Sequence, residues 1–329
     1  MKNHAQLRQE VEKALQGLEV WQGEPQGLYQ PAVYALGQGG KRIRPVLALM
    51  ACQLFGKDCA LALMPAIGLE VFHNFTLLHD DVMDKAAIRH GLPTVHMKWN
   101  ANTAILSGDA MFAAAVSLTA KTPPASLPAV LDAFHRLALG VCEGQQYDMN
   151  FESQVQVSMA EYMEMIRLKT AVLIAGALEI GALVARAPET DVKHLYAYGN
   201  KIGLAFQLQD DWLDLYADEA KFGKKLGGDI RENKKTYLYI RAIEKLETED
   251  RKQLEHWFSV ATTPDNQEEK TVAVKTLFEK ADAPRDCKEA VSKLFAEAGK
   301  HLSALSPLTD PAALKELQAF SAGLLGREF

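Results

Sequence analysis

Two short acidic runs carry the chemistry that this sequence indicates most clearly. The first is DDVMD (80–84), the second is DDWLD (210–214), and each follows a strongly apolar stretch. In a helix, side chains four positions apart share one face, so the outer aspartates of each run lie about one turn apart. Like charges at that spacing repel each other, and a divalent cation between them removes the repulsion.

Magnesium is the cation that suits such runs best. It accepts a few carboxylates, retains waters and completes its shell with substrate phosphates. Two acidic runs on helices that face each other would repel strongly in a cleft without counter-charge. A single run could be a solvated acidic helix end, whereas two runs of the same pattern predict a site for metal ions and a diphosphate.

Basic side chains near glycines would complete a diphosphate site. GGKRIRP (39–45) places Lys41, Arg42 and Arg44 beside two glycines, which let the backbone approach an anion closely. Lysine and arginine then supply charge-assisted hydrogen bonds. Lys169 precedes a long apolar run, where a lysine costs free energy unless it reaches an anion or snorkels to solvent. Further basic residues follow the acidic runs: Arg89, Lys224, Lys225, Lys234 and Lys235.

The elements that must position these residues are helices. Segments 61–81, 103–119, 127–147, 158–184 and 192–215 are long and rich in Ala, Leu, Met, Glu and Gln, which are strong helix formers. Some are apolar on more than one face, as in helices buried in a large core. Alternating strand patterns are scarce, and the breaks are too short for interdomain linkers. We expect one all-α domain over residues 1–329.

Bulk composition excludes several classes of function. The net charge of −6 gives no global basic surface for nucleic acid. No apolar run reaches the roughly 18 residues of a transmembrane helix, and the N-terminus has no signal-peptide pattern. The four cysteines have no metal-ligand spacing. We expect a cytoplasmic protein without a transmembrane segment or a nucleic-acid partner.

These motifs together resemble the trans-isoprenyl diphosphate synthases, the polyprenyl synthetase family. The matching pieces occur in the family's order across residues 37–240 and are GGKRIRP (39–45), LLHDDVMD (77–84), RHGLPTVH (89–96), AILSGDAMF (104–112), Lys169-Thr170, FQLQDDWLD (206–214) and GKKLGGDIRENKKT (223–236). The resemblance implies a bundle of mostly antiparallel helices around a central active-site cavity, usually as a homodimer. It also implies a short-chain prenyltransferase that condenses isopentenyl diphosphate with dimethylallyl, geranyl or farnesyl diphosphate.

The resemblance assigns roles to individual residues. The implied magnesium ligands are Asp80, Asp84 and Asp210, with Asp81 and Asp214 in support, for three ions with Mn²⁺ as an alternative. The implied contacts to the allylic diphosphate are Arg89, Lys169, Thr170, Gln207, Lys224 and Lys234. The implied contacts to isopentenyl diphosphate are Lys41, Arg44, His73 and His90.

His90 departs from the family pattern, which has a second arginine there. Histidine lacks the bidentate fork of arginine and is mostly neutral at pH 7. We therefore expect weaker, somewhat pH-dependent binding of isopentenyl diphosphate rather than loss of activity.

The implied mechanism needs no protein nucleophile. Magnesium and basic side chains neutralise charge on the leaving diphosphate, and the double bond of isopentenyl diphosphate attacks the allylic cation. The departing diphosphate takes the final proton. A dry cavity protects the cation, which the carbonyl of Lys169 and the side chain of Gln207 would stabilise.

Product length is expected to depend on the residues before the first acidic run. Phe75 lies five positions before Asp80, about 7.5 Å along a helix axis. A bulky residue there is typical of short-chain synthases, and the small Thr76 beside it favours a twenty-carbon over a fifteen-carbon product. Val71 and Phe72 lie deeper. Ordinary core packing of an aromatic is the alternative reading of Phe75.

Three other functions stay open. A class I terpene cyclase shares the first motif, but its second metal motif normally contains Asn, Ser or Thr, and Glu. A non-catalytic partner subunit typically lacks one acidic motif. A long-chain polyprenyl synthase shares both motifs, and Phe75 argues against it.

Overall fold

The computed structural model describes residues 1–217 and 226–325, which divide into two compact units. Unit 1 comprises Met1–Arg136, Gly176–Tyr196 and Leu305–Gln318, and unit 2 comprises Leu137–Ala175, Ala197–Ala304 and Ala319–Phe329. Four helices contribute to both units, namely α7 (Leu127–Ser153), α9 (Val172–Val184), α10 (Glu189–Tyr216) and α17 (Pro311–Leu325). The all-α prediction is confirmed, while the single-domain prediction stays a prediction.

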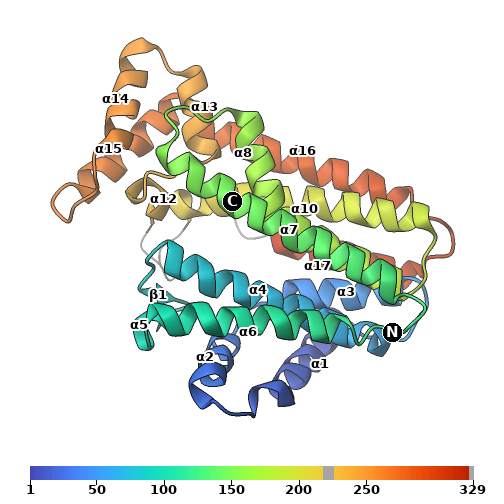
Figure 1. The fold of residues 1–329 in the computed structure, drawn as a ribbon. Coiled ribbons are helices and arrows are strands. Elements are labelled where there is room, and N and C mark those ends of the chain that lie inside the picture. Colours follow the sequence, from blue (N-terminus) through green and yellow to red (C-terminus); the bar gives the residue numbers. More distant parts are fainter. Residues whose placement is uncertain (218–225, 326–329) are drawn as a thin grey trace. The chain divides into compact units, whose positions relative to one another are not determined.

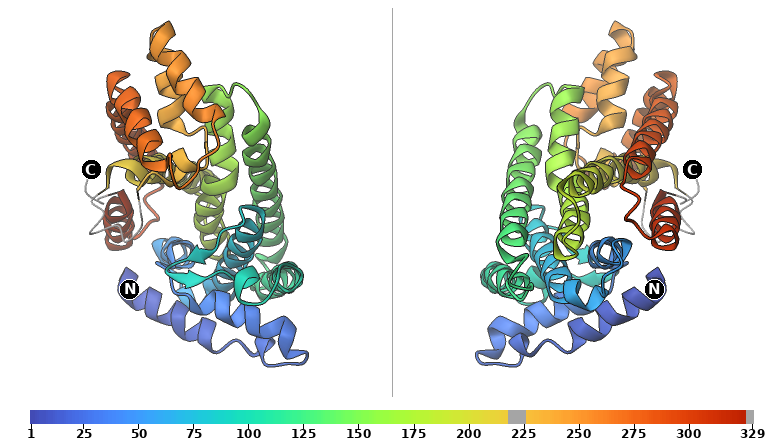
Figure 2. Two further views of the ribbon diagram at one scale, coloured as in Figure 1. Left: turned by 90° about the vertical axis from the view of Figure 1, so that its left-hand side faces the viewer. Right: turned by 90° about the vertical axis from the view of Figure 1, so that its right-hand side faces the viewer.

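Unit 1 is built around one apolar helix, α4, which packs along α6 (Figure 1). The elements that lie wholly within unit 1 include α1 (His4–Gln16), η1 (Glu19–Trp21), α2 (Gln26–Gly37), α3 (Ile43–Leu54), η2 (Cys59–Ala62), α4 (Leu63–Met83), β1 (Ile88–Arg89), β2 (Leu92–Pro93), α5 (Val95–Lys98) and α6 (Ala101–Thr119). The strands form a two-stranded antiparallel hairpin just after α4 (Figure 2). Most residues in the first half of α4 are buried, as expected for a helix that is apolar on several faces.

Unit 2 places the second acidic run near the end of α10. Its other elements are α8 (Met159–Ile166), the π-helical turn η3 (Arg167–Ala171), α12 (Gly228–Arg231), α13 (Tyr237–Lys245), α14 (Thr248–Ser259), α15 (Gln267–Lys280) and α16 (Ala283–Ser303). A capping box starts α8, because the Ser158 hydroxyl accepts from the backbone N–H of Glu161 while the Glu161 carboxylate accepts from that of Ser158. Among the described residues, α12–α15 contact one another as a group of shorter helices (Figure 1).

Two segments, η2 with α4 (Cys59–Met83) and α6 (Ala101–Thr119), are long and apolar enough to cross a membrane by length and composition alone. That test is also passed by core helices of soluble proteins. The first segment is such a core helix, since it carries the acidic run and packs against α3 and α6.

Arg42 joins the loop of residues 39–45, which carries Lys41 and Arg44, to the core of unit 1. Its side chain is 4% exposed, and its guanidinium donates to Glu70 and Glu12 at 2.9 Å each and to the backbone oxygen of Leu36 at 2.7 Å. Asn74 also donates to the Glu70 carboxylate, at 3.3 Å. Arg42 is therefore an internal anchor of the loop, which leaves Lys41 and Arg44 as its candidate diphosphate contacts.

We predict that Arg42→Met lowers the free energy of unfolding by roughly 3–5 kcal/mol, because the Glu70 carboxylate stays buried without its cation. Urea unfolding measures the change. The double variant Arg42→Met/Glu70→Leu should recover much of the loss, since it removes both buried charges. A single variant as stable as the parent would contradict the prediction.

Candidate active site

In the first acidic run, the second aspartate is held inside the fold. Asp81 is 5% exposed, and its Oδ1 accepts from both Nε and Nη2 of Arg89 at 2.8 Å. Asp80 is half-buried and Asp84 is exposed, at the end of α4. The two outer carboxylates are thus the accessible ones, as a metal site requires, while Asp81 fixes the hairpin that carries Arg89.

The hairpin explains how Arg89 returns to α4. Its two-residue turn is His90-Gly91, with φ values of 51° and 78°, and the register pairs Arg89 with Leu92. Positive φ at both central positions is the geometry of a type I′ turn, whose twist matches that of paired strands. Histidine tolerates the left-handed region better than most residues. From the sequence, His90 was expected only as a substrate ligand, and its place in this turn was not predicted.

Two of the residues assigned to isopentenyl diphosphate, Arg44 and His90, lie near a third, His73. Burial is the main reason that the pKa of His73 lies well below its usual value, followed by the positive charges of Arg44 and Arg89. His73 is therefore neutral at pH 7, so it can donate a hydrogen bond without adding charge. A narrow cleft beside it is lined by residues that include Asn74, Asp81, Arg89 and His90.

Lys41 follows a loop whose backbone needs glycine. Gly39 and Gly40 have φ values of 86° and 134°, and Arg42 has 51°. Glycine here was expected to allow close approach to an anion, and the positive φ values add a conformational reason for it.

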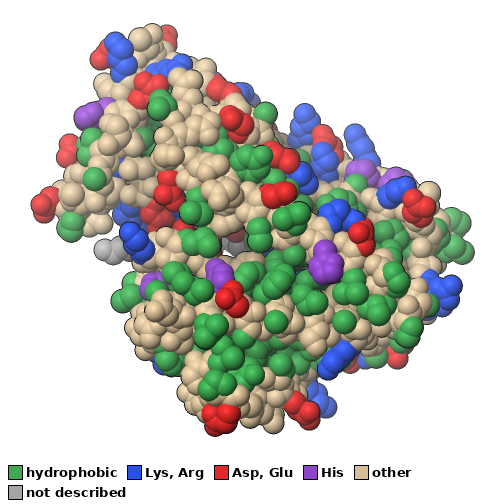
Figure 3. Space-filling model, in the orientation of Figure 1, with side chains coloured by type: hydrophobic (Ala, Val, Ile, Leu, Met, Phe, Trp, Pro, Cys, Tyr) green, Lys and Arg blue, Asp and Glu red, His purple; other side chains and the backbone are tan. Residues whose placement is uncertain are grey.

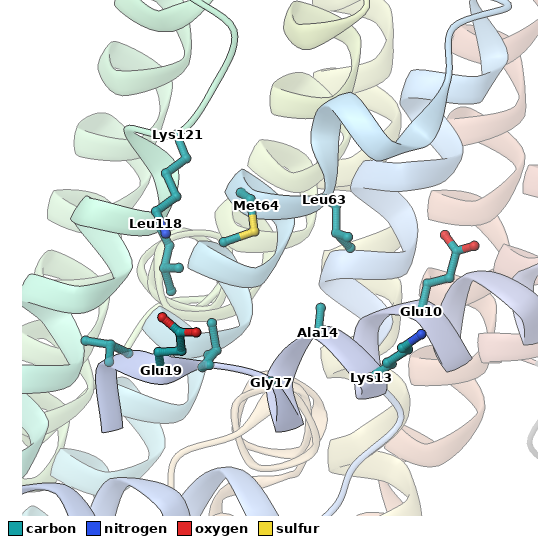
Figure 4. A pocket seen from close by; sticks show the side chains of 11 residues that line it. Glu10, Lys13, Ala14, Gly17, Glu19, Leu63, Met64, Leu118 and Lys121 are labelled. Carbon is teal, nitrogen blue, oxygen red and sulfur yellow. The ribbon is translucent and has the colours of Figure 1, made fainter. Parts of the chain in front are cut away.

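A second, larger cavity of about 520 Å³ lies elsewhere in unit 1 (Figure 4). Leu63 and Met64 line it from the first turn of α4, at the opposite end of that helix from Asp80, and Lys13 and Lys121 line it from outside the helix. None of the residues predicted for the site line it. The acidic run therefore marks the candidate site better than cavity size does.

Phe75 belongs to a cluster of aromatic rings. Its centroid lies 5.5 Å from that of Phe72 and 5.4 Å from that of Phe112 on α6, and Phe72 lies 5.5 Å from Phe134 on α7. Val71 is buried beside this cluster, and the Thr76 hydroxyl donates to the backbone oxygen of His73 at 2.8 Å. The sequence indicated Phe72 and Phe75 but not Phe112 and Phe134, because only tertiary packing brings the three helices together.

The second acidic run repeats the arrangement of the first. Asp211 is buried and accepts from the Tyr162 hydroxyl, from Gln207 Nε2 at 3.1 Å and from the backbone N–H of Tyr237 at 3.4 Å. Burial raises the pKa of Asp211 to about 7 even though these hydrogen bonds oppose the shift. Asp210 and Asp214 are partly exposed.

The acidic residues around Asp214 suit a cation. Its Oδ2 accepts from the backbone N–H of Asp229 at 3.0 Å. Burial, together with the charges of Asp214 and Asp211, raises the pKa of the Asp229 carboxyl well above its usual value. Within the described residues no three His, Cys, Asp or Glu side chains form a closed metal cage. Magnesium does not require one, because it keeps waters and takes oxygen ligands from its substrate.

Lys169 and Thr170 lie in the π-helical turn η3, a feature that is frequent at functional sites. Two glycines let neighbouring helices touch this turn. A Cβ on Gly144 of α7 would lie 2.3 Å from the backbone N of Lys169, and one on Gly203 of α10 would lie 2.5 Å from the Cα of Ala171. The Thr170 hydroxyl donates to Gln207 Oε1 at 3.0 Å, which links the turn to Asp211. Lys169 Nζ pairs with Asp148 at 2.6 Å.

Lys234 also lies in unit 2 and pairs with Glu232 at 2.9 Å. Lys224 lies outside the described residues. Of the predicted contacts to the allylic diphosphate, unit 2 thus joins Thr170 and Gln207 by a direct hydrogen bond, and unit 1 supplies Arg89 beside Asp81.

Comparison with known proteins decides the family. Residues 25–277 match the polyprenyl synthetase family. The chain belongs to this family. It is a polyprenyl diphosphate synthase, and therefore a prenyltransferase, so the predicted family, all-α fold and enzyme class are confirmed. The expectation of a short-chain prenyl diphosphate synthase is confirmed with them.

Several relatives of this synthase have names that bear on its product. It is 40% identical over 223 residues to a geranylgeranyl diphosphate synthase of Methanosarcina mazei, covering 67% of this chain and 69% of the relative. It is 42% identical over 223 residues to a geranylgeranyl pyrophosphate synthase of Geoglobus acetivorans, covering 67% and 70%. A crystal structure of a geranylgeranyl pyrophosphate synthase superposes with a TM-score of 0.94 at 43% identity over all of both chains.

A further structure bears on the metal. The geranylgeranyl pyrophosphate synthase of Corynebacterium glutamicum, complexed with isoprenyl diphosphate and magnesium, has a TM-score of 0.87 and 25% identity, covering 99% of this chain and 98% of that one. Members of the family thus bind magnesium with diphosphate substrates. The fold is that of a soluble enzyme, while the cytoplasmic compartment stays a prediction.

We predict that Gly144→Ala impairs this synthase through the π-helical turn. The added Cβ would displace the backbone of Lys169, so the KM for the allylic diphosphate should rise roughly tenfold, with a loss of about 1–3 kcal/mol in stability. Steady-state kinetics and urea unfolding measure the two effects.

Gly140→Ala is the matched control, one turn earlier on α7. A Cβ there would meet Leu168 and Val172 side chains at 3.5 and 3.6 Å, which is ordinary contact. That variant should keep its KM. Equal kinetics in the two variants would show that close approach at Gly144 does not position Lys169.

Proposed function

We propose that this synthase condenses isopentenyl diphosphate with allylic diphosphates to make a twenty-carbon prenyl diphosphate, geranylgeranyl diphosphate, with the fifteen-carbon product as the nearest alternative. One observation supports the chemistry above the others. Both acidic runs bury the second aspartate on a fixed partner and leave the outer aspartates accessible. Two equivalent sets of carboxylates are what a diphosphate with several cations needs.

We assign metal binding to Asp80 and Asp84 in the first acidic run and to Asp210 in the second, with Asp214 in support. Three magnesium ions held there, or manganese in their place, would neutralise the charge that develops on the leaving diphosphate. Asp81 acts through Arg89, which it orients for the same diphosphate. Lys169, Lys224 and Lys234 complete the cationic contacts.

The protein's own groups orient both substrates. Lys41 and Arg44 hold the diphosphate of isopentenyl diphosphate, and neutral His73 donates to it, while His90 replaces an arginine at lower affinity. The Gln207 side-chain oxygen accepts a hydrogen bond from the Thr170 hydroxyl at 3.0 Å, which fixes the orientation of the amide. In this proposal the amide stabilises the allylic cation. As the allylic C–O bond breaks, the new C–C bond forms, and the released diphosphate accepts the proton lost from the isopentenyl carbon.

The decisive experiment incubates the purified full chain with magnesium, dimethylallyl diphosphate and labelled isopentenyl diphosphate, and sizes the products. A prenyl diphosphate of twenty carbons is expected. A product without diphosphate would favour a terpene cyclase. No condensation by folded protein with any allylic primer would favour a non-catalytic partner subunit.

The aromatic cluster supports the short product length. Phe75 lies one helical turn before His79. Its ring packs against those of Phe72 and Phe112, and Phe134 packs against Phe72, so three helices contribute to the cluster. A chain that grows along α4 away from the acidic run would meet this cluster first. The names of relatives near 40% identity agree with a twenty-carbon product.

We predict that Phe75→Ala lengthens the product by one or more five-carbon units, because truncation opens space along α4. Phe112→Ala should lengthen it in the same direction from the α6 side. Chromatography of the dephosphorylated products measures the length. Phe295→Ala, a partly exposed aromatic on α16, serves as the control. Unchanged products in both cluster variants would show that the cluster does not limit the length of the product.

We propose further that the enzyme is a homodimer that uses the outer face of α6. Ile105 is 44% exposed and Leu106 is 60% exposed, and Met97 on the adjoining α5 is 57% exposed. Figure 3 shows hydrophobic side chains dominating the surface over α2 and α6. An apolar patch of this kind usually marks a protein contact. A second copy of the same face would cover it by two-fold symmetry.

Leu106→Glu should shift the protein from dimer towards monomer in sedimentation velocity, because the interface would bury an unpaired charge. Gln253→Glu on α14 adds the same charge at another exposed position and should leave the mass unchanged. A wild-type monomer at micromolar concentration would refute the proposal.

A further inference from the structure

A fully buried lysine supports the loop that carries Lys234. Lys270, on α15, has a relative exposure of 0%. Its ammonium donates to Asn233 Oδ1, to the backbone oxygen of Val260 at 3.0 Å and to Thr262 Oγ1 at 3.0 Å. An ammonium has three N–H donors, and each has an acceptor here. All three of these acceptors are neutral oxygens.

Burying a lysine only to fill space would cost free energy, because its charge must leave water. Lysine is almost never fully buried unless it is paired. A methionine would fill similar space on α15 without the cost of removing a charge from water. Burial accordingly lowers the pKa of Lys270. The three hydrogen bonds are therefore the reason to keep a lysine at this position.

Two of the acceptors of Lys270, Asn233 and Thr262, hold the segment 227–235 in place. Asn233 directly precedes Lys234 and has a φ of 56°, so the chain turns sharply there. Thr262, which accepts from Lys270, donates in turn to the backbone oxygen of Arg231 at 2.6 Å. The ammonium thus fixes both the side chain of the turning residue and, through Thr262, the end of α12.

The neighbour of Lys270 supports the same segment from the same helix. A Cβ on Gly227 would lie 2.9 Å from Cγ2 of Thr271, so α12 begins in close contact with α15 (Figure 1). At the other end of the segment, Lys235 Nζ donates to the backbone oxygen of Phe151 at 2.7 Å. Segment 227–235 is therefore held at both ends, and Lys270 holds its middle.

We propose that Lys270 is a positioning residue for allylic diphosphate binding, which fixes the backbone turn at Asn233 and thereby the direction of Lys234. This inference rests on the proposed role of Lys234 in binding that diphosphate. Lys270 itself lies outside every sequence motif that indicated the site and touches no substrate.

The test substitutes Lys270→Met, which keeps the length of the side chain and removes its N–H groups. The KM for the allylic diphosphate should rise about tenfold, while the KM for isopentenyl diphosphate should stay within about twofold. Lys280→Met is the matched control, because Lys280 lies on the same helix, is 61% exposed and pairs with Asp250. The control should retain both KM values.

A second variant keeps the test valid if Lys270→Met folds poorly. Asn233→Gly removes the acceptor in the loop, leaves the Lys270 ammonium its two other acceptors, and tolerates the φ of 56° at this position. It should raise the same KM, and the double variant should be no worse than the more impaired single variant, since both remove one interaction. Additive effects, or equal rises in both KM values, would overturn the proposal and leave Lys270 a general stability residue.

Hydrogen exchange separates this inference from the proposed function. Backbone amides of residues 228–235 should exchange faster in Lys270→Met than in the parent, while those of α16 should not change. If the parent makes no prenyl diphosphate, the proposed function fails whatever the exchange shows. If the parent is active and these amides are unaffected by the substitution, the positioning role fails alone.

Discussion

The rest of the site depends on one constraint, the burial of the second carboxylate in each acidic run. A buried carboxylate needs hydrogen-bond partners, and each run obtains them from a different element. Asp81 takes Arg89 from the hairpin, and Asp211 takes Tyr162 from α8. Each pair therefore ties a neighbouring element to the helix that bears the metal ligands. The outer carboxylates stay accessible because the inner one has been used for structure.

A second layer of support acts on the backbone. Glycines at 144 and 203 let two helices touch the π-helical turn, and Arg42 and Lys270 place buried cations under two loops that carry basic residues. The two buried cations have different kinds of hydrogen-bond partner. Arg42 is neutralised by carboxylates, whereas Lys270 is solvated by neutral oxygens, in the way that water would solvate it. In both cases a buried cation holds the backbone of a loop, and the loop in turn positions basic side chains that can reach a diphosphate.

The sequence predicted the helices and located both acidic runs near helix ends, because these depend on local pattern and composition, while the basic contacts to the diphosphates stay predictions. It could not predict which aspartate of a run turns inward, since the partners Arg89 and Tyr162 come from other elements. It treated Arg42 as one cation among three, although tertiary contacts bury it. It placed Phe75 correctly on α4 but missed Phe112, because nothing local to α6 reveals which helix its ring will meet.

The π-helical turn has a consequence for how this segment tolerates changes of length. A π turn contains one residue more than an α-helical turn of the same rise, so it behaves as an insertion absorbed between α8 and α9. Deleting one residue within 167–171 would let the two helices merge into a regular α-helix. Every side chain after the deletion would keep its face towards the core, yet Lys169 and Thr170 would lose the bulge that sets their direction. The segment could thus stay folded while Lys169 and Thr170 no longer reach the substrate. The number of residues in 167–171 therefore matters for the active site and not for the fold.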